Sequence, residues 1–383
     1  MRQFYSYALT VLAVAVFIAH ASFSSAALPP SPEPGLKPVI KSKVSPPAPR
    51  RTAKVPKPTR RPVKPASEEE ALPATDVDET LPLPKYPAGA RIAIGKMQTY
   101  KLGEEDTLLD VARHFRLGFI EARAANPDTD PWTPVPGEEV IIPAFKLLPR
   151  TVQKGIVVNL AQMRMYYFKN PDQEPVTFPI GVGREGLQTP TGETTVIRKV
   201  AGPIWYPTAR MREEKPFLPP AVRAGPSNPL GTHALYLGWP TFLIHGSNKP
   251  WAIGRRVSSG CMRMYPEDIS DLFEMAPVGT KVTVVDQPIL AGWIGDKFYL
   301  EANPSKTQGN DIEIEGEHAV RELDDALKKV IAGAAGVPSE MIDWEAVKTV
   351  VAERRGYPVL IANKNLPPAP KKKPVRVDYR FNP

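Results

Sequence analysis

One cysteine and one histidine stand out as residues that could do chemistry together. Cys261 is the only cysteine among 383 residues, and it follows the polar loop residues Ser258, Ser259 and Gly260. His245 lies sixteen positions earlier, directly after a short apolar run. An unpaired thiol in such a loop is typical of a reactive cysteine, and an imidazole that takes its proton makes it a nucleophile. The pair predicts acyl transfer through a thioester.

The neighbouring residues predict how this pair is brought together. Residues 242–244 are expected to form a strand that ends at His245, and Gly246 lets the backbone turn closely beside it. The chain returns to Cys261 through a loop, so we expect the imidazole and the thiol within hydrogen-bond reach. A thiolate–imidazolium pair with a lowered cysteine pKa would follow. Gly260, which has no side chain, lets the backbone N–H groups around Cys261 approach a developing oxyanion.

Other uses of these residue types are weaker. A structural zinc site needs four Cys or His ligands, whereas the chain has one cysteine and five dispersed histidines. We therefore predict no metal and no cofactor. His233, in the apolar run 232–237, is a rival base, but no motif accompanies it and strand histidines are more often structural. Arg263 is expected either to meet a substrate carboxylate or to form a salt bridge that shapes the loop.

Three ordered motifs around these residues resemble those of a known enzyme family. They are Thr189-Pro190-Thr191-Gly192, Ile244-His245-Gly246-Ser247-Asn248 and Ser258-Ser259-Gly260-Cys261-Met262-Arg263-Met264. The stretch from about Thr151 to Asp286 is thereby similar to the L,D-transpeptidase family, also called the YkuD domain. The resemblance implies an enzyme that cleaves the bond between the third and fourth residues of a peptidoglycan stem peptide. It would hold the acyl part as a thioester and pass it to an amine.

The resemblance also implies roles for the site residues. Cys261 would be the nucleophile, His245 the general base, and the backbone carbonyl of Gly246 the group that orients the imidazole. The residues predicted to bind the oxyanion or the substrate are Gly260, Ser258 and Arg263. Ser259 stands where many family members have histidine, which leaves the assigned base unchanged.

The elements that must position these residues form a mainly β unit. Alternating apolar runs, punctuated by Gly and Pro turns, fill the predicted catalytic domain at residues 150–286. We expect a sandwich or an open barrel. Pro266 suits the first position of a helix after the cysteine loop. The run 281–285 is expected to be the last strand.

A smaller unit precedes the catalytic domain at residues 93–146. Its pattern predicts a strand, a helix with Asp106 as N-cap, a second helix over 119–125 and a final strand. Its motifs are Asp106-Thr107-Leu108, Asn126-Pro127, Pro136-Gly137 and Ile142-Pro143. This stretch resembles a LysM domain, with Glu105 where that family usually has Gly. The resemblance implies a βααβ module that binds N-acetylglucosamine-containing glycan strands.

The N-terminal region predicts export. Residues 1–27 have a charged start, an apolar core and a small-residue exit, as in a secretory signal peptide. An uncleaved membrane anchor is the alternative, although the apolar run is shorter than the roughly 20 residues of a membrane span. Residues 28–92 are a predicted Pro-rich basic linker. Between 28 and 67 ten basic residues face one acidic residue, an excess of +9 in a chain of net charge +8.

These features limit the partners and the compartment. We expect an exported protein of the periplasm or cell wall that acts on peptidoglycan, with no nucleic acid as partner. Membrane contact is expected only if the signal is uncleaved. The acyl acceptor stays open among a diaminopimelate amine, an amine of an envelope protein and water. A non-catalytic wall-binding scaffold is the alternative function. Residues 287–383 are predicted to be a helical extension without an assigned role.

Overall fold

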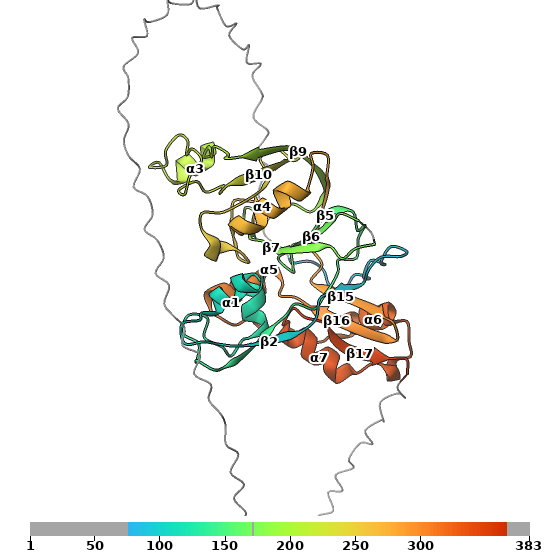
Figure 1. Ribbon diagram of the computed structural model, residues 1–383. Helices are drawn as coiled ribbons and strands as arrows, with labels where there is room; N and C mark the ends of the chain where they lie inside the picture. The colour runs from blue at the N-terminus through green and yellow to red at the C-terminus, as the bar shows by residue number, and fades with distance from the viewer. Residues whose placement is uncertain (1–75, 171, 366–383) are drawn as a thin grey trace, which may run out of the picture. The chain divides into compact units, whose positions relative to one another are not determined.

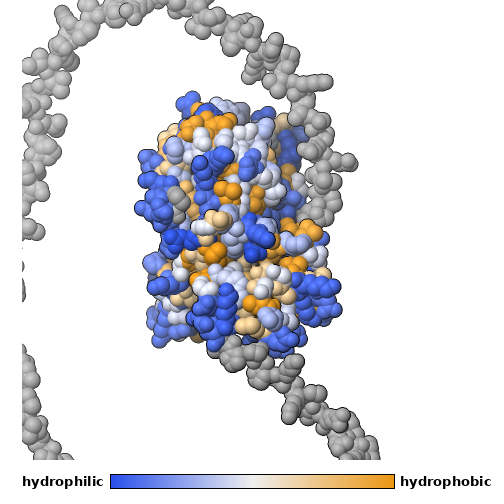
Figure 2. All heavy atoms as spheres, turned by 90° about the vertical axis from the view of Figure 1, so that its right-hand side faces the viewer, coloured by the Kyte–Doolittle hydropathy of each residue, from blue (hydrophilic) through white to orange (hydrophobic). Residues whose placement is uncertain are grey.

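The computed structural model describes residues 76–170 and 172–365 of the chain (Figure 1). The predicted signal peptide, 1–27, lies outside these residues. Among the described helices, none has the length and apolar character needed to span a membrane. On the face shown in Figure 2, apolar side chains form small patches between hydrophilic ones, as on ordinary protein surfaces.

The described end of the predicted linker, 76–92, is packed against the rest of the chain. The side chain of Glu79 is buried, and its Oε2 lies 2.5 Å from Nη2 of the buried Arg354. The hydroxyl of Tyr86 donates a hydrogen bond of 2.9 Å to the carbonyl of Leu148. This part of the chain therefore belongs to the folded unit, although the sequence predicted linker as far as residue 92.

The segment after the linker has the predicted order of strand, two helices and strand. Its elements are β1 (Ala93–Ile94), β2 (Gln98–Lys101), α1 (Leu108–His114), α2 (Phe119–Ala125), β3 (Glu139–Ile142) and β4 (Lys146–Leu147). β2 pairs with β3 and β1 with β4, both antiparallel. The N-cap of α1 is Thr107, whose side chain forms a capping box with Asp110, so the prediction of Asp106 was wrong. Asp106 instead accepts hydrogen bonds from Gly103 N–H and the Tyr100 hydroxyl.

The catalytic segment is mainly β, as predicted, and is built on one eight-stranded mixed sheet. The strand order is β13-β11-β10-β9-β14-β5-β6-β7. The strands are β5 (Gly155–Asn159), β6 (Arg164–Phe168), β7 (Val176–Pro179), β9 (Gly192–Ala201), β10 (His233–Leu237), β11 (Leu243–His245), β13 (Met262–Arg263) and β14 (Lys281–Val285). The pairs β11–β13 and β14–β5 are parallel, and the other neighbours are antiparallel.

Short elements complete this segment. They are β8 (Val182–Gly183), α3 (Ala209–Glu214), η1 (Pro250–Ala252), β12 (Arg256–Ser258) and α4 (Pro266–Met275). β8 and β12 form a separate parallel pair. α4 begins at Pro266, as predicted, and lies against β10 (Figure 1). Its apolar face, with Ile269 and Leu272, joins the core of the large sheet.

The C-terminal segment contains the predicted helices and also a sheet that the sequence did not predict. Its elements are β15 (Ile289–Ile294), β16 (Lys297–Ala302), α5 (Lys306–Ile314), α6 (Asp325–Ala335), η2 (Ser339–Met341), α7 (Trp344–Glu353) and β17 (Val359–Asn363). The three strands are antiparallel in the order β15-β16-β17. α6 and α7 pack on this sheet around their own apolar core.

The N-terminal end of α2 contacts the loop that connects His245 with Cys261. The backbone N–H groups of Phe119 and Ile120 donate to the carbonyls of Ile253 and Gly254 at 3.2 and 3.1 Å. Gly254 has φ +77°, and a Cβ there would lie 2.1 Å from the nitrogen of Phe119. Only glycine fits such a close approach of two backbones, so the loop depends on α2 for its position.

A buried ionic cluster joins α2 to β4 and β6. One carboxylate oxygen of Glu121, on α2, lies 2.7 Å from Nη1 of Arg164 on β6, and the other lies 2.9 Å from Nζ of Lys146. All three side chains are almost fully buried. Burial raises the pKa of the Glu121 carboxyl, but the two cations outweigh it, so the pKa lies below its ordinary value. The carboxylate is therefore charged, and the cluster is a paired one.

Candidate active site

The parallel pair β11–β13 brings the predicted site residues to one face of the sheet. Ile244 is aligned with Met262, and His245 with Arg263. Ile244 and Met262 are fully buried in the core. Because side chains alternate along a strand, His245, Arg263 and Cys261 point away from that core, toward the opposite face.

His245 is held in one tautomer. Its ring is buried, and Nδ1 lies 2.6 Å from the carbonyl oxygen of Gly246. A carbonyl can only accept, so Nδ1 carries the proton and Nε2 is left as an acceptor. Burial, and then the charge of Arg263, lower the pKa of His245 to about 3. The imidazole is therefore neutral near pH 7 and can take a proton at Nε2.

The thiol of Cys261 is partly exposed and neutral at rest. Burial raises its pKa above the ordinary value, although the Leu243 N–H and the charge of Arg263 act in the opposite direction. Its Sγ donates to the carbonyl of Thr241 at 3.5 Å. Among the described residues, no hydrogen bond joins Sγ to the imidazole. The structure thus differs from the thiolate–imidazolium pair expected from the sequence, because two partly desolvated groups avoid charge.

A network of short hydrogen bonds shapes the loop before Cys261. The Ser258 hydroxyl donates to the carbonyl of Cys261 at 2.6 Å and accepts the N–H of Gly260 at 3.1 Å. Thr189 accepts the N–H of Gly183 and donates to the carbonyl of Gly260 at 2.8 Å. Ser258 is thus committed within the loop rather than facing a substrate. Thr189 thus joins the Thr189-Pro190-Thr191-Gly192 motif to the cysteine loop, a contact that the sequence motif alone did not indicate.

Gly260 is required by backbone geometry. Its φ is +101°, and a Cβ would lie 2.8 Å from Cε1 of Phe242. Since the Gly260 N–H is already donated to Ser258, it is not free for an oxyanion in this state. The Cys261 N–H is the candidate donor that remains among the backbone N–H groups expected around the thiol.

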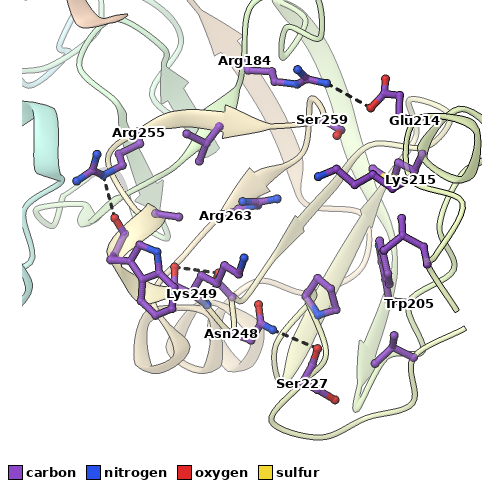
Figure 3. Close-up of a pocket in the computed structure, with 18 of the residues that line it drawn as sticks. Arg184, Trp205, Glu214, Lys215, Ser227, Asn248, Lys249, Arg255, Ser259 and Arg263 are labelled. Atoms are coloured by element: carbon purple, nitrogen blue, oxygen red, sulfur yellow. Dashed lines mark hydrogen bonds and ion pairs between the residues drawn. The ribbon is translucent and has the colours of Figure 1, made fainter. Parts of the chain in front are cut away.

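A cavity of about 1000 Å³ is lined by Ser259 and Arg263, which stand on either side of Cys261 in the sequence, whereas Cys261 and His245 are not among its lining residues (Figure 3). Arg263 lies in the middle of the view, with Arg255 to its left and Lys215 to its right. Ser259 also lines the cavity, so the position that often holds histidine in the family faces it. Among the described residues, no carboxylate lies within 4 Å of the Arg263 guanidinium, and its buried Nε has no hydrogen-bond partner. The structure does not contain the salt bridge that the sequence left open for Arg263.

Comparison with known proteins decides the family. Residues 153–284 match the model of the YkuD L,D-transpeptidase catalytic domain. The Escherichia coli protein named "Probable L,D-transpeptidase YbiS" is 39% identical over 290 residues, which cover 73% of this chain and 91% of that protein. The chain belongs to the L,D-transpeptidase family. A Salmonella typhimurium protein named "Probable L,D-transpeptidase ErfK/SrfK" is 36% identical over 296 residues, which cover 73% of this chain and 90% of that protein.

Membership of the L,D-transpeptidase family makes the chain a cysteine-dependent acyl-transferring enzyme. Cys261 is the only cysteine of this L,D-transpeptidase. The described residues contain no cluster of His, Cys, Asp and Glu that could hold a metal ion. The LysM-like segment lies outside the matched residues 153–284.

The rival base His233 has a different environment in this L,D-transpeptidase. Its Nδ1 lies 3.0 Å from the Thr232 hydroxyl, and its ring packs on Phe273 of α4 with 4.5 Å between the ring centroids. The backbone carbonyl of His233 accepts the N–H of Gly246 at 3.1 Å. These contacts give His233 a packing role beside the strand that carries His245.

Proposed function

We propose that this enzyme acylates Cys261 with a peptidoglycan stem peptide and transfers the acyl group to an amine. The observation that carries the proposal is the guanidinium of Arg263, which lines the cavity without a carboxylate partner among the described residues. A partly buried cation of this kind suits the carboxylate of a peptide substrate. Arg263 lies only two residues from the thiol, so it would orient the donor there.

In the acylation step, Sγ of Cys261 attacks the donor carbonyl while its proton passes to Nε2 of His245. The thiol must first leave the Thr241 carbonyl and turn toward the imidazole. Because both groups start neutral, charge develops only as the bond forms. The Cys261 N–H would stabilise the oxyanion. The imidazolium then gives its proton to the leaving amine, and a thioester remains on Cys261.

In the transfer step, the acceptor amine attacks the thioester and loses a proton to His245. The tetrahedral intermediate collapses, the thiolate of Cys261 leaves and recovers the proton, and the new amide is released. The acceptor that we propose is an amine of diaminopimelate or of an envelope protein. His245 alternates between base and acid, which requires the tautomer fixed by Gly246.

We also propose that the segment 93–146 binds the glycan strand and that the enzyme works in the periplasm or cell wall. The LysM-like motifs support the first point, and the signal-like sequence 1–27 supports the second. A membrane partner is not required for this function. The proposed catalytic domain, 150–286, contains all the residues of the acyl-transfer step.

The test uses isolated peptidoglycan and the purified protein. We expect new amide links, found by mass spectrometry of muramidase digests, and a thioester adduct on intact Cys261 protein when no amine is supplied. Cys261→Ala should remove both products with an unchanged melting temperature. Crosslinks formed by that variant would refute the thiol mechanism, and products of hydrolysis alone would refute the amine acceptor.

A further inference from the structure

Two tryptophans from separate segments are exposed in the cavity beside the predicted catalytic residues. Trp132, in the connection from α2 to β3, is 56% exposed, and Trp251, in η1, is 53% exposed. Both line the cavity that Ser259 and Arg263 also line. Large aromatic side chains left open in a cavity are typical of ligand-binding sites, and the acyl-transfer steps above use neither of them.

Contacts of Arg255 and Phe119 hold the region between the two tryptophans in place. Nε of Arg255 donates to the carbonyl of Trp251 at 3.0 Å, and Nη1 lies 3.3 Å from a carboxylate oxygen of Glu313. The Arg255 guanidinium lies 3.6 Å from the ring centroid of Phe119 and 5.9 Å from that of Trp132. Phe119 in turn stacks on Trp132, with centroids 6.0 Å apart and planes inclined by 26°. Two of the three guanidinium nitrogens of Arg255 are therefore engaged, and Phe119 contacts both Arg255 and Trp132.

We name the set Trp132, Trp251, Arg255 and Glu313 the aromatic wall. Such a wall offers flat apolar faces beside a paired Arg255 and Glu313, in which one guanidinium nitrogen and one carboxylate oxygen have no hydrogen bond among the described residues. The C–H faces of a pyranose ring pack on aromatic faces, while its hydroxyl and acetamido groups need hydrogen-bond donors and acceptors at the ring edge. A peptide side chain would need only one of these two features. The combination matches a sugar.

We propose that the aromatic wall is a saccharide subsite of the acyl-transfer cavity. Its ligand is the amino-sugar part of the glycan strand that carries the stem peptide, an identification that rests on the proposed function. Arg263 and Ser259 bind the peptide, and the aromatic wall binds the sugar of the same molecule. The cavity of about 1000 Å³ lies at the upper end of the range of small-ligand sites, so it has room for both.

The residues of the aromatic wall come from three segments of the chain. Trp132 belongs to the LysM-like segment 93–146, Trp251 and Arg255 to the catalytic segment, and Glu313 to α5 of the C-terminal extension. The three segments thus share one ligand site. The C-terminal extension, which has no role that could be predicted from the sequence, contributes the carboxylate of Glu313.

The first test measures binding without turnover. The Cys261→Ala protein is titrated calorimetrically with a disaccharide-tetrapeptide of peptidoglycan and with the free tetrapeptide. We expect tighter binding of the sugar-bearing ligand. Adding Trp132→Ala or Trp251→Ala should lower the affinity for that ligand by about three- to tenfold, the scale of one aromatic contact. The affinity for the free tetrapeptide should stay unchanged. Trp132→Phe should restore most of the binding.

Val135→Ala is the matched control, since Val135 is an exposed apolar residue of the same loop that does not line the cavity. Equal affinity for the two ligands, or an equal effect of the tryptophan variants on both, would overturn the subsite.

The second test compares kcat/KM for the same two donors, measured with the enzyme that retains Cys261. If the sugar-bearing ligand binds through the tryptophans but the enzyme converts neither donor, the subsite is supported and the proposed function is contradicted.

Discussion

The central feature at the residue scale is a thiol and an imidazole that are both neutral at rest. The thiolate is the form of cysteine that reacts with oxidants and electrophiles. Burial raises the pKa of Cys261 and lowers that of His245 to about 3. The lone cysteine is therefore kept in its less reactive form until a substrate is bound, and the proton moves only during attack.

The neutral pair makes a prediction about His245→Ala. We expect alkylation of Cys261 by iodoacetamide to show a pH midpoint above the ordinary range of a cysteine. The midpoint should hardly move in His245→Ala, because a neutral imidazole does not stabilise a thiolate. Acylation by the substrate should nevertheless slow by about 10²-fold or more, the usual effect of losing a general base.

Intact-protein mass spectrometry over a pH series measures both rates, with thermal melts as the control for folding. A wild-type midpoint below the ordinary cysteine range, which rises when His245 is removed, would reinstate the thiolate–imidazolium pair.

At this scale the sequence indicated the residues but not their charge states. Cys261 and His245 could be found because cysteine is unique in the chain and the histidine ends a strand. The hydroxyls of Thr189 and Ser258 resembled many other polar groups, so their hydrogen bonds to the loop backbone could not be predicted. The pKa directions depend on burial by residues distant in sequence, which the local pattern around Cys261 does not contain.

At the scale of the elements, α4 contains a buried carboxyl that the mechanism does not use. Asp268, in the first turn, is fully buried, and neither of its oxygens has a hydrogen-bond partner among the described residues. Nε of Arg116 lies 3.5 Å from it. Burial raises the pKa of this carboxyl to about 6, from an ordinary 3.8. Its charged form is thus unfavourable in the folded protein.

This carboxyl predicts a loss of stability as the pH rises. Below about pH 4 it is protonated in both states, and between about pH 4 and 6 only the unfolded chain releases the proton. The unfolding free energy should fall by about 3 kcal/mol over that range. Asp268→Asn should remove this fall. Denaturant titrations at several pH values measure it, and Glu274→Gln, an exposed change in the same helix, is the control. Parallel pH profiles for wild type and Asp268→Asn would contradict the assignment.

The elements themselves were largely predictable, but their pairing was not. Alternating runs identified β5, β6 and β10, and Pro266 marked the start of α4. The parallel pairing of β11 with β13 joins short strands separated by a long loop, and neither strand has a pattern that specifies its partner. The sheet β15-β16-β17 was missed because its third strand lies more than fifty residues beyond the second.

At the scale of the whole described unit, the LysM-like segment is part of the support of the active site. α2 donates two backbone hydrogen bonds to the loop between His245 and Cys261, and the cluster around Glu121 fixes α2 to β6. The sequence predicted two separate domains because each has its own apolar pattern. The contacts between them include the close approach at Gly254, the buried cluster around Glu121, and ion pairs from Arg113 and Arg116 to α4. A linear pattern does not reveal such contacts.

This arrangement predicts a strong effect of Glu121→Gln. The substitution leaves Arg164 and Lys146 buried without their anion, so the unfolding free energy should fall by about 3–5 kcal/mol. Hydrogen exchange should also become faster at the amides of Phe119 and Ile120. Denaturant titration and exchange mass spectrometry measure these effects. Glu105→Gln, an exposed change in the same segment, should stay within about 0.5 kcal/mol of wild type. Equal stability of the two variants would show that the cluster does not join the segments.

The position of β14 in the sheet has a consequence for the order of folding. β14 lies between β9 and β5, yet it is the last of the eight strands in the chain. Until residues 281–285 are available and in place, the groups β5-β6-β7 and β9-β10-β11-β13 have no strand to join them, and each has an open edge. The sheet is therefore completed by its last strand in the chain, through contacts that are distant in sequence. Cys261 precedes that strand, so the thiol is present in the chain before the sheet that must hold it can close.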